Sequence, residues 1–247
     1  MKLEILGTGG GNTPEYGNTS FLIWNENDSE ALLMDCGYTV YPYLKNLEAV
    51  SGREIISKIK TVAISHLHDD HVGSFGALLT HRWLLQKSKI KTAGVSLDDY
   101  LRLILSSHAR TGIDGIDKRV LSIPTSHEDD MPSYALYFEG VLYSGDTNKS
   151  ILGLSEAKNA KIIIHEARLN DFYTHTNIEK LAQSAPSDIL AKTWVIHYST
   201  KMRDKIQLRA KELGFAGACS QGQIIDVPNN MYPTLIRNSI TNGKQHF

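Results

Sequence analysis

Five of six consecutive residues of this chain carry side chains suited to metal binding, within the run His66-Leu67-His68-Asp69-Asp70-His71. They follow the apolar run Thr61–Ile64, which predicts a short buried strand, and the residues after them predict a helix. A tight turn between a strand and a helix aims neighbouring side chains at different points. We therefore expect His66 and His68 to face one side of the turn, and Asp70 and His71 the other. Imidazole and carboxylate ligands suit zinc or manganese, and one such turn can hold two ions.

Three further candidates lie at the ends of predicted strands, where the remaining ligands of a two-metal site are expected. His127 follows a short strand within Val120–Ser126, and His197 ends the strand Thr193–His197. Asp146 stands where an apolar strand stops at a Gly-Asp pair, and a carboxylate there can bridge two cations, which an imidazole rarely does. A strand-end histidine taken singly is more often structural. As the missing partners of the turn, these three residues are predicted ligands.

Length and composition agree with a soluble enzyme. The chain has 247 residues, enough for one domain over residues 1–247, and its net charge of -1 gives no strong attraction to nucleic acid or membrane. Two isolated cysteines, Cys36 and Cys219, make neither a disulfide framework nor a cysteine-based zinc site. The segment Met1–Gly7 predicts a strand entering a glycine turn rather than a signal peptide, and no apolar run is long enough to span a membrane. We expect a cytoplasmic protein.

Hydrophobic periodicity predicts an α/β protein with two sheets packed face to face and helices outside. The run Gly7–Gly11 lacks the lysine and the helix of a phosphate-binding loop, so we interpret it as a tight turn near the active site. The predicted strands lie near 2–6, 20–24, 31–35, 61–64, 89–95, 119–123, 134–138, 141–144, 161–165, 193–197 and 223–227. The predicted helices lie near 40–50, 74–86, 97–108, 177–184 and 203–213.

Several short motifs, spread over most of the chain, resemble the metallo-β-lactamase superfamily and, within it, the RNase Z-like branch. The motifs are Leu6-Gly7-Thr8-Gly9-Gly10, Met34-Asp35-Cys36-Gly37, the turn His66–His71, His127, Ser144-Gly145-Asp146-Thr147, Ile164-His165-Glu166-Ala167, His175-Thr176 and His197-Tyr198-Ser199. The turn is typical of the whole superfamily, whereas the His-Glu-Ala and His-Thr pair is far more specific for the branch. The resemblance implies an αββα metallo-β-lactamase sandwich.

The resemblance also implies which residue binds which metal. His66, His68 and His127 would hold one ion, Asp70, His71 and His197 the other, and Asp146 would bridge the two. Asp35 would support the ligands without binding metal. The ions are expected to be zinc, with manganese as the alternative.

A second set of residues is implied for the chemistry. His175 would act as the general acid that protonates the departing alkoxide, and Glu166 would orient it. The predicted catalytic residues are therefore Asp70, His175 and Glu166, while His165 is expected to pack beside the site. The branch motif His-Glu-Ala-Thr ends here in Arg168, a change that could place a phosphate or base contact at this position.

The branch contains tRNA 3′-processing endonucleases, which carry a long tRNA-gripping arm between the residues matching His127 and Asp146. Here the segment opens with the acids of Glu128–Asp130 and continues into a short hairpin, so there is no arm. The chain is more similar to the armless phage anti-Pycsar phosphodiesterases, whose Gly-Asn-Thr-Ser start is matched by Gly17–Ser20. That resemblance implies hydrolysis of 3′,5′-cyclic mononucleotides to 5′-monophosphates, which would disarm cyclic-nucleotide anti-phage signalling.

The same resemblance implies a homodimer, for which the apolar residues of the tail 228–247 offer an interface. The partner subunit could help to close the pocket. Three alternatives stay open at this point. RNase Z-type cleavage of tRNA is the first, a lactonase or thioester hydrolase the second, and a non-enzymatic metal-binding scaffold or nucleotide sensor the third. The His-Glu-Ala and His-Thr pair argues against the second, and the complete ligand set against the third.

Overall fold

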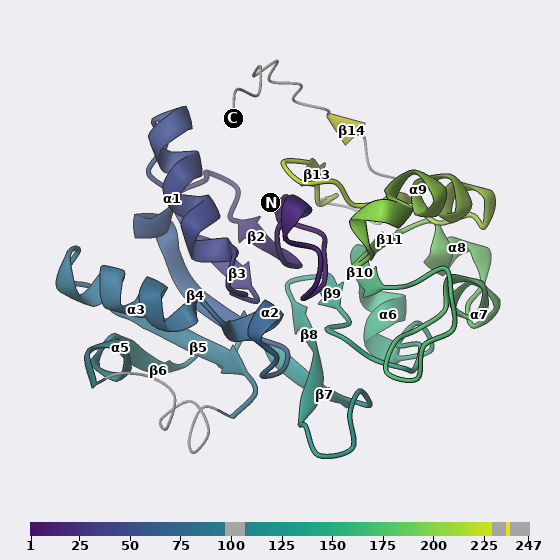
Figure 1. The fold of residues 1–247 in the computed structure, drawn as a ribbon, viewed down its shortest axis with the longest axis horizontal. Helices are drawn as coiled ribbons and strands as arrows, with labels where there is room; N and C mark the ends of the chain where they lie inside the picture. The colour runs from purple at the N-terminus through teal and green to yellow at the C-terminus, as the bar shows by residue number, and fades with distance from the viewer. Residues whose placement is uncertain (97–106, 229–235, 238–247) are drawn as a thin grey trace.

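Two mixed β-sheets face each other in the middle of the molecule, and helices cover the outer side of each sheet (Figure 1). This computed structural model describes residues 1–96, 107–228 and 236–237. In the described chain the first sheet runs, in spatial order, through β14 (Ile236–Arg237), β13 (Ile224–Asp226), β1 (Lys2–Gly7), β2 (Ser20–Trp24), β3 (Ala31–Met34), β4 (Ile59–Ile64), β5 (Ile90–Gly94) and β6 (Ile113–Ile116). The second runs through β12 (Gly217–Ala218), β11 (Thr193–Ile196), β10 (Ile162–Glu166), β9 (Val141–Tyr143), β8 (Ser133–Phe138) and β7 (Leu121–Thr125).

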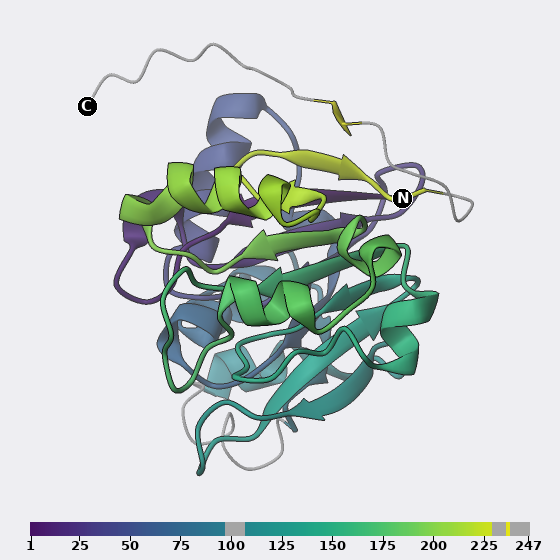
Figure 2. The same ribbon diagram turned by 90° about the vertical axis from the view of Figure 1, so that its right-hand side faces the viewer.

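The helices divide between the two outer faces in the order of the chain (Figure 1, Figure 2). Beside the first sheet lie α1 (Val40–Ser51), α3 (Phe75–Leu84) and α5 (Ser107–Thr111). Beside the second lie α6 (Ser155–Asn159), α7 (Ile178–Gln183), α8 (Ser187–Leu190) and α9 (Arg203–Glu212). The one-turn helix α2 (Asp69–Val72) follows β4, and short 3₁₀ helices span Pro14–Tyr16, Ile56–Lys58 and Thr200–Met202.

Alternating side chains along the strands build the layers, because successive residues of a strand face opposite sides of its sheet. In β10, Ile162 and Ile164 join the core between the sheets, while Ile163 packs in the cluster formed with the helices of the second half. In β4, Ala63 faces the inter-sheet core and Val62 packs in the cluster beneath α1 and α3. Strands buried on both sides and sandwiched between helix layers give the αββα arrangement that was expected.

The predicted site residues lie where parallel strands end at a common edge. Strands β3, β4 and β5 pair in parallel, as do β9, β10 and β11. Asp35 directly follows β3, the histidine-rich turn follows β4, and Asp146 lies just beyond β9. Glu166 ends β10 and His197 follows β11. The topology therefore brings five short segments, distant in sequence, to one edge of the sandwich.

Most of the predicted elements are confirmed within one or two residues. The structure adds β6, β12, α6 and α8, which the sequence analysis missed because each has only two to five residues. Strand β7 ends at residue 125 rather than 123 and accommodates Pro124 because it is an edge strand, whose outer side needs no N–H donor. The predicted helix over 97–108 and the apolar tail fall largely outside the described residues. No helix in the described ranges has both the length and the apolar character needed to cross a bilayer.

Candidate metal centre

The turn after β4 places its side chains as the sequence pattern predicts. His68 has an extended backbone immediately before α2, and Asp70 and His71 lie within that single helical turn. His66, Asp70 and His71 are buried, whereas the His68 side chain is 30% exposed. The backbone thus changes from extended to helical within two residues. As a result, His66 and His68 face one point of the centre, and Asp70 and His71 face another.

Three histidine nitrogens converge on the first of these points. His68 Nδ1 lies 3.0 Å from His66 Nε2 and 3.2 Å from His127 Nε2. Ligand nitrogens about 2.0 Å from a tetrahedral zinc ion are separated by about 3.3 Å, so this spacing fits three nitrogen ligands of one ion. A carboxylate oxygen of Asp146 lies 4.0 Å from each Nε2 of the other two histidines.

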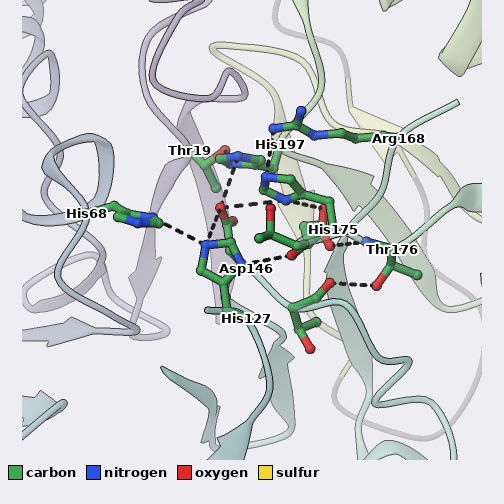
Figure 3. A network of polar contacts seen from close by, with 12 residues as sticks. Thr19, His68, His127, Asp146, Arg168, His175, Thr176 and His197 are labelled. Carbon is green, nitrogen blue, oxygen red and sulfur yellow. Dashed lines mark hydrogen bonds and ion pairs between the residues drawn. The ribbon is translucent and has the colours of Figure 1, made fainter. Parts of the chain in front are cut away.

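A second group lies on the other side of Asp146. His71 Nε2 is 3.5 Å from Asp70 Oδ2 and 3.4 Å from Asp146 Oδ1. His197 Nε2 is 3.1 Å from Asp146 Oδ2. Asp146 therefore directs Oδ1 toward His71 and Oδ2 toward His66, His127 and His197, a placement that suits a carboxylate shared between two ions. Figure 3 shows Asp146 beside His127 and His197.

In each of these histidine rings one nitrogen faces the centre and the other, the outer nitrogen, makes a hydrogen bond to the surrounding protein. That bond fixes which nitrogen faces inward. His127 Nδ1 donates to the Thr174 carbonyl over 2.8 Å, and His71 Nδ1 donates to Asp35 Oδ2 over 2.7 Å. His197 Nδ1 lies 3.0 Å from Thr19 Oγ1, whose own hydroxyl donates to the Gly9 carbonyl, so the ring must be the donor.

The ring of His66 is likewise a donor through its outer nitrogen. Its Nδ1 lies 3.0 Å from Ser65 Oγ, and that hydroxyl already donates to Asp35 Oδ2. Each of the four rings thus directs Nε2 at the centre, and this nitrogen carries a lone pair whenever the ring is neutral. Converging lone pairs repel one another, and a cation between them removes that repulsion.

Electrostatics of the centre also favour bound cations. Burial lowers the pKa of His66 and His127, and it lowers the pKa of His197 to about 3, so these rings are neutral ligands at physiological pH. Burial opposes the charge of Asp146 as well, yet the surrounding histidines, His71 among them, outweigh it and hold the pKa of that carboxyl well below its usual range. The exception is His71: burial opposes its charge, but the carboxylates of Asp146, Asp35 and Asp70 raise the pKa of this ring well above its usual range. The centre therefore combines ionised carboxylates with imidazoles that are mostly neutral, and a bound cation would take the place of the charge on His71.

Unpartnered buried atoms give an independent test of the fit. Among the described residues, His71 Nε2 and Asp146 Oδ1 are fully buried and have no hydrogen-bond partner. Leaving such atoms unpaired costs free energy unless something coordinates them. Their position between the two groups, and the nitrogen and oxygen character of the donors, fit divalent metal ions.

Asp35 organises the centre from below, as the sequence resemblance implied. Its side chain accepts the backbone N–H of Ser65 over 2.7 Å, the Ser65 hydroxyl over 2.8 Å and the Tyr143 hydroxyl over 2.8 Å, besides the ring of His71. Its backbone has φ +57°, a conformation that L-residues rarely adopt. A strained residue that joins both sheets to one ligand is consistent with a supporting role.

The glycine run lies directly over the centre. A Cβ atom added at Gly10 would stand 2.9 Å from His197 Nε2, and one added at Gly11 would stand 3.6 Å from the Asp70 carboxyl carbon. Any side chain at Gly10 would therefore press on a predicted ligand atom. The expectation of a tight turn is confirmed, and this turn lies beside the candidate metal site.

His175 and Glu166 lie beside the second ligand group. His175 Nδ1 is 3.3 Å from Glu166 Oε2 and 3.8 Å from Asp146 Oδ2, and the ring is stacked against His197 with a centroid distance of 5.2 Å. Glu166 is held by the backbone N–H of Thr176, which donates to Oε1 over 2.6 Å. Burial raises the pKa of Glu166 to about 7. The two residues thus stand together at the edge of the candidate metal site.

His165, next in the chain to Glu166, faces away from the centre. It is fully buried, and its ring donates from Nδ1 to the Glu166 carbonyl and accepts at Nε2 from the backbone of Ile151. It therefore supports the strand end, in agreement with the expectation that it packs beside the site.

Comparison with known proteins decides the family. The family described as "Anti-Pycsar protein Apyc1" matches residues 1–93 and 84–225 of the chain. This chain belongs to the anti-Pycsar Apyc1 family. An anti-Pycsar protein Apyc1 from Paenibacillus sp. (strain J14) is 27% identical over 230 residues, which cover 82% of this chain and 91% of that protein.

Two solved structures place this Apyc1-family protein in the metallo-β-lactamase fold. The metallo-β-lactamase fold protein YhfI from Bacillus subtilis has a TM-score of 0.69 and 20% identity, covering 91% of this chain and 99% of its own. The short form of human tRNase Z, ELAC1, has a TM-score of 0.65 and 18% identity, covering 92% of this chain and 100% of its own. At these identities the two neighbours show the fold.

A cavity opens beside the metal site of this Apyc1-family protein. It has a volume of about 700 Å³, and its lining includes Gly10, Arg168, Phe172 and His197. The cavity therefore joins the glycine loop, one predicted ligand and the loop that carries His175. Its volume is within the range of pockets that hold small molecules.

Sequence reasoning missed several residues that hold the ligands. Thr19 and Ser65 bond outer ring nitrogens, and Thr174 does so through its backbone carbonyl. Thr19 lies in the Gly-Asn-Thr-Ser motif and Ser65 directly precedes His66, but neither residue was assigned a function from the sequence. Glu128, noted only as one of the acids that open the armless segment, has Oε2 3.4 Å from His68 Nε2.

Proposed function

We propose that the protein is a metal-dependent phosphodiesterase that hydrolyses 3′,5′-cyclic mononucleotides to 5′-monophosphates, and that it thereby disarms cyclic-nucleotide anti-phage signalling. The observation that carries this proposal is the placement of His175 and Glu166 against two ligand groups that share Asp146. Membership of the anti-Pycsar family and the small cavity support the choice of substrate.

The ligand assignment follows the two groups described above. His66, His68 and His127 would hold one divalent ion, Asp70, His71 and His197 a second, and Asp146 both. Zinc is the first expectation because imidazole nitrogens dominate the donor set, and manganese is the alternative. When bound, a pair of such ions lowers the pKa of a shared water molecule and neutralises charge on a phosphoryl group.

The protein's own residues then handle the leaving group. We assign to His175 the donation of a proton to the departing 3′ oxygen, because its Nδ1 faces the shared carboxylate and therefore the region where the phosphate would lie. Glu166 fixes the orientation of the ring, and Thr176 fixes Glu166. Such an acid matters because an alkoxide is a poor leaving group unless it is protonated.

A small substrate suits the surroundings of the site better than a tRNA. The segment between the predicted ligands His127 and Asp146 is a short loop followed by the hairpin of β8 and β9, turned by Glu139 and Gly140 with φ +48° and +90°. A hairpin of this length offers no arm. The net charge of -1 likewise supplies no general attraction for a polyanion.

Hydrolysis assays test the proposal. The metal-loaded protein is incubated with 3′,5′-cAMP, cGMP, cCMP and cUMP, and separately with a precursor tRNA, each with and without chelator. We expect chelator-sensitive release of 5′-monophosphates and intact tRNA. Cyclic nucleotides that stay intact while tRNA is cut would overturn the substrate assignment and favour an RNase Z-type endonuclease. No reaction with either substrate would overturn the phosphodiesterase proposal itself.

We also propose that the protein acts as a homodimer, as the family resemblance implies. Light scattering coupled to size-exclusion chromatography would give a mass of twice the 27.5 kDa chain. A single-chain mass at assay concentrations would overturn this assignment.

A further inference from the structure

We infer that Arg168 binds the phosphate of the substrate, and that without substrate its guanidinium rests on His175. This inference rests on the proposed function, since it names a substrate contact of the same site. Arg168 stands where the related branch motif has threonine. A long cation replaces a short hydroxyl side chain at the edge of the metal site, so the substitution changes what this position can bind.

The resting contact of Arg168 is with a neutral acceptor. Arg168 Nη2 donates to His175 Nε2 over 2.8 Å (Figure 3). A guanidinium has only donors and keeps its charge in proteins, so the histidine nitrogen must accept through a lone pair. In this state the proton of His175 is therefore on Nδ1, the side that faces Glu166 and Asp146.

Within the described residues no carboxylate neutralises this cation. The guanidinium bonds His175 and lies over the Phe172 ring, with Cζ 5.0 Å from the ring centroid. Stacking on a ring leaves the donors in the guanidinium plane free to turn toward another acceptor. By contrast, Arg209 and Arg53 each make a two-pronged ion pair with a glutamate.

The backbone holds Arg168 in a position from which it can reach the site. Its N–H donates to the Thr176 carbonyl over 2.9 Å, and its carbonyl accepts the N–H of Ile178 over 2.9 Å. These bonds close the loop 168–177, so Arg168 and His175 stay adjacent. The side chain lines the cavity of about 700 Å³ together with the predicted ligand His197. A phosphate bound at the metal site would thus lie at the end of the cavity that Arg168 borders.

The relative strength of the two contacts decides which one the guanidinium makes when substrate arrives. The contact with His175 pairs the cation with a neutral acceptor through one hydrogen bond, whereas a phosphodiester adds an opposite charge and lets the guanidinium bind two oxygens at once. A phosphodiester anion is therefore a better partner than the lone pair of a neutral imidazole. Transfer of Arg168 to the phosphate also leaves His175 Nε2 open.

Kinetics of Arg168 variants test the inference. In the metal-loaded enzyme we expect Arg168→Ala to raise KM for a cyclic nucleotide by about ten- to hundredfold, the loss usual for a hydrogen bond to a charged group. Arg168→Lys should recover part of the loss, and guanidinium chloride should lower the KM of the alanine variant. Lys180→Ala is the matched control, because this exposed cation is already paired with the exposed Asp171.

Binding of inorganic phosphate separates this inference from the proposed function. Calorimetry on the metal-loaded protein should show phosphate binding at least about tenfold weaker in Arg168→Ala than in wild type, and unchanged binding in Lys180→Ala. Equal affinity of wild type and Arg168→Ala for phosphate would overturn the inference. A KM unchanged in Arg168→Ala with kcat reduced would also overturn it, because Arg168 would then act only by positioning His175. A wild type inert to cyclic nucleotides that still loses phosphate binding with Arg168 would overturn the substrate assignment alone.

Discussion

The predicted ligands and the predicted proton donor lie side by side, yet the protein holds them in opposite ways. The ring centroid of His175 is 5.3 Å from that of His127 and 5.2 Å from that of His197. The outer nitrogens of those two ligands donate to oxygen atoms, which leaves lone pairs facing the centre. The outer nitrogen of His175 accepts from Arg168, which leaves a proton facing the centre. One arrangement suits metal binding and the other suits a phosphate.

The difference extends to the backbone around each set. The ligands follow the ends of buried strands and are fixed by residues such as Asp35, Thr19 and Ser65. His175 belongs to the loop 168–177, whose tip carries Phe172 and Tyr173 with 47% and 79% exposure. The residues at the strand ends should therefore determine whether metal binds, and the loop 168–177 should determine how the substrate reacts.

The largest expected effect is the loss of the shared ligand. Asp146→Ala removes the carboxylate that both groups face, so we expect the protein to lose its metal and at least about a thousandfold in activity, given the several kcal/mol that metal ions contribute. Elemental analysis of the purified variant measures the metal, and the cyclic-nucleotide assay measures the rate. An Asp146→Ala protein with the metal content of wild type would contradict the assignment of Asp146 as a shared ligand. The proposed division between a metal-binding region and a substrate-handling loop would then fail.

Removing the proton donor should separate the two regions. His175→Ala leaves every assigned ligand in place, so we expect normal metal content and an activity about a hundred- to ten-thousandfold below wild type, the usual contribution of a general acid. Elemental analysis and the same assay provide both readings. Wild-type hydrolysis by His175→Ala would show that this residue takes no part in the reaction.

A smaller effect is expected where a supporting residue is changed. Asp35→Asn keeps the shape of the side chain but weakens its bonds to His71, Ser65 and Tyr143, so we expect metal affinity to fall about ten- to hundredfold. Titration with a competing chelator measures the affinity. An affinity equal to that of wild type would mean that the strand ends alone position His71.

The smallest effect concerns stability in the loop region. Burial raises the pKa of Glu166 from 4.5 to about 7, so the native state keeps a proton that the unfolded state loses in this window. The contribution of Glu166 to stability is therefore complete below about pH 4.5 and is lost as the pH rises through about 7. Glu166→Gln is neutral in both states and avoids this loss.

Thermal unfolding of the metal-free proteins measures the difference. We expect Glu166→Gln to unfold at a higher temperature than wild type at pH 8, by a few degrees, and the gap to shrink toward pH 4. A gap that widens as the pH falls would contradict the assigned direction of the pKa shift.

The ligand region could be predicted from sequence to a larger extent than the loop region. His66–His71 is one contiguous motif, and Asp146 and His197 follow apolar strands whose ends meet at a common sheet edge. The partners of these residues could not be predicted in the same way. Thr19 and His197 are separated by 178 positions in the chain, and only tertiary packing places the hydroxyl on the ring nitrogen.

Arg168 shows the same limit in the loop. Its departure from the branch motif was visible, and a contact with a phosphate or base was one interpretation, but the sequence did not decide its role. The contact with His175 was not predicted, because it depends on how the loop 168–177 closes through the Arg168–Thr176 backbone bond. Short elements such as β12 were missed for a related reason, since two residues contain no measurable periodicity.

The central claim is that the protein hydrolyses a cyclic nucleotide by attack of water on phosphorus, and that the residues assigned as ligands would hold the metal ions that this chemistry needs. The most direct test is hydrolysis of 3′,5′-cAMP by the metal-loaded protein in ¹⁸O-labelled water, followed by ³¹P NMR and mass analysis of the product. We predict 5′-AMP with one ¹⁸O atom on phosphorus, and no product once the metal is chelated. Unchanged cAMP, or a 3′-monophosphate, or product formation that persists in chelator would contradict the account.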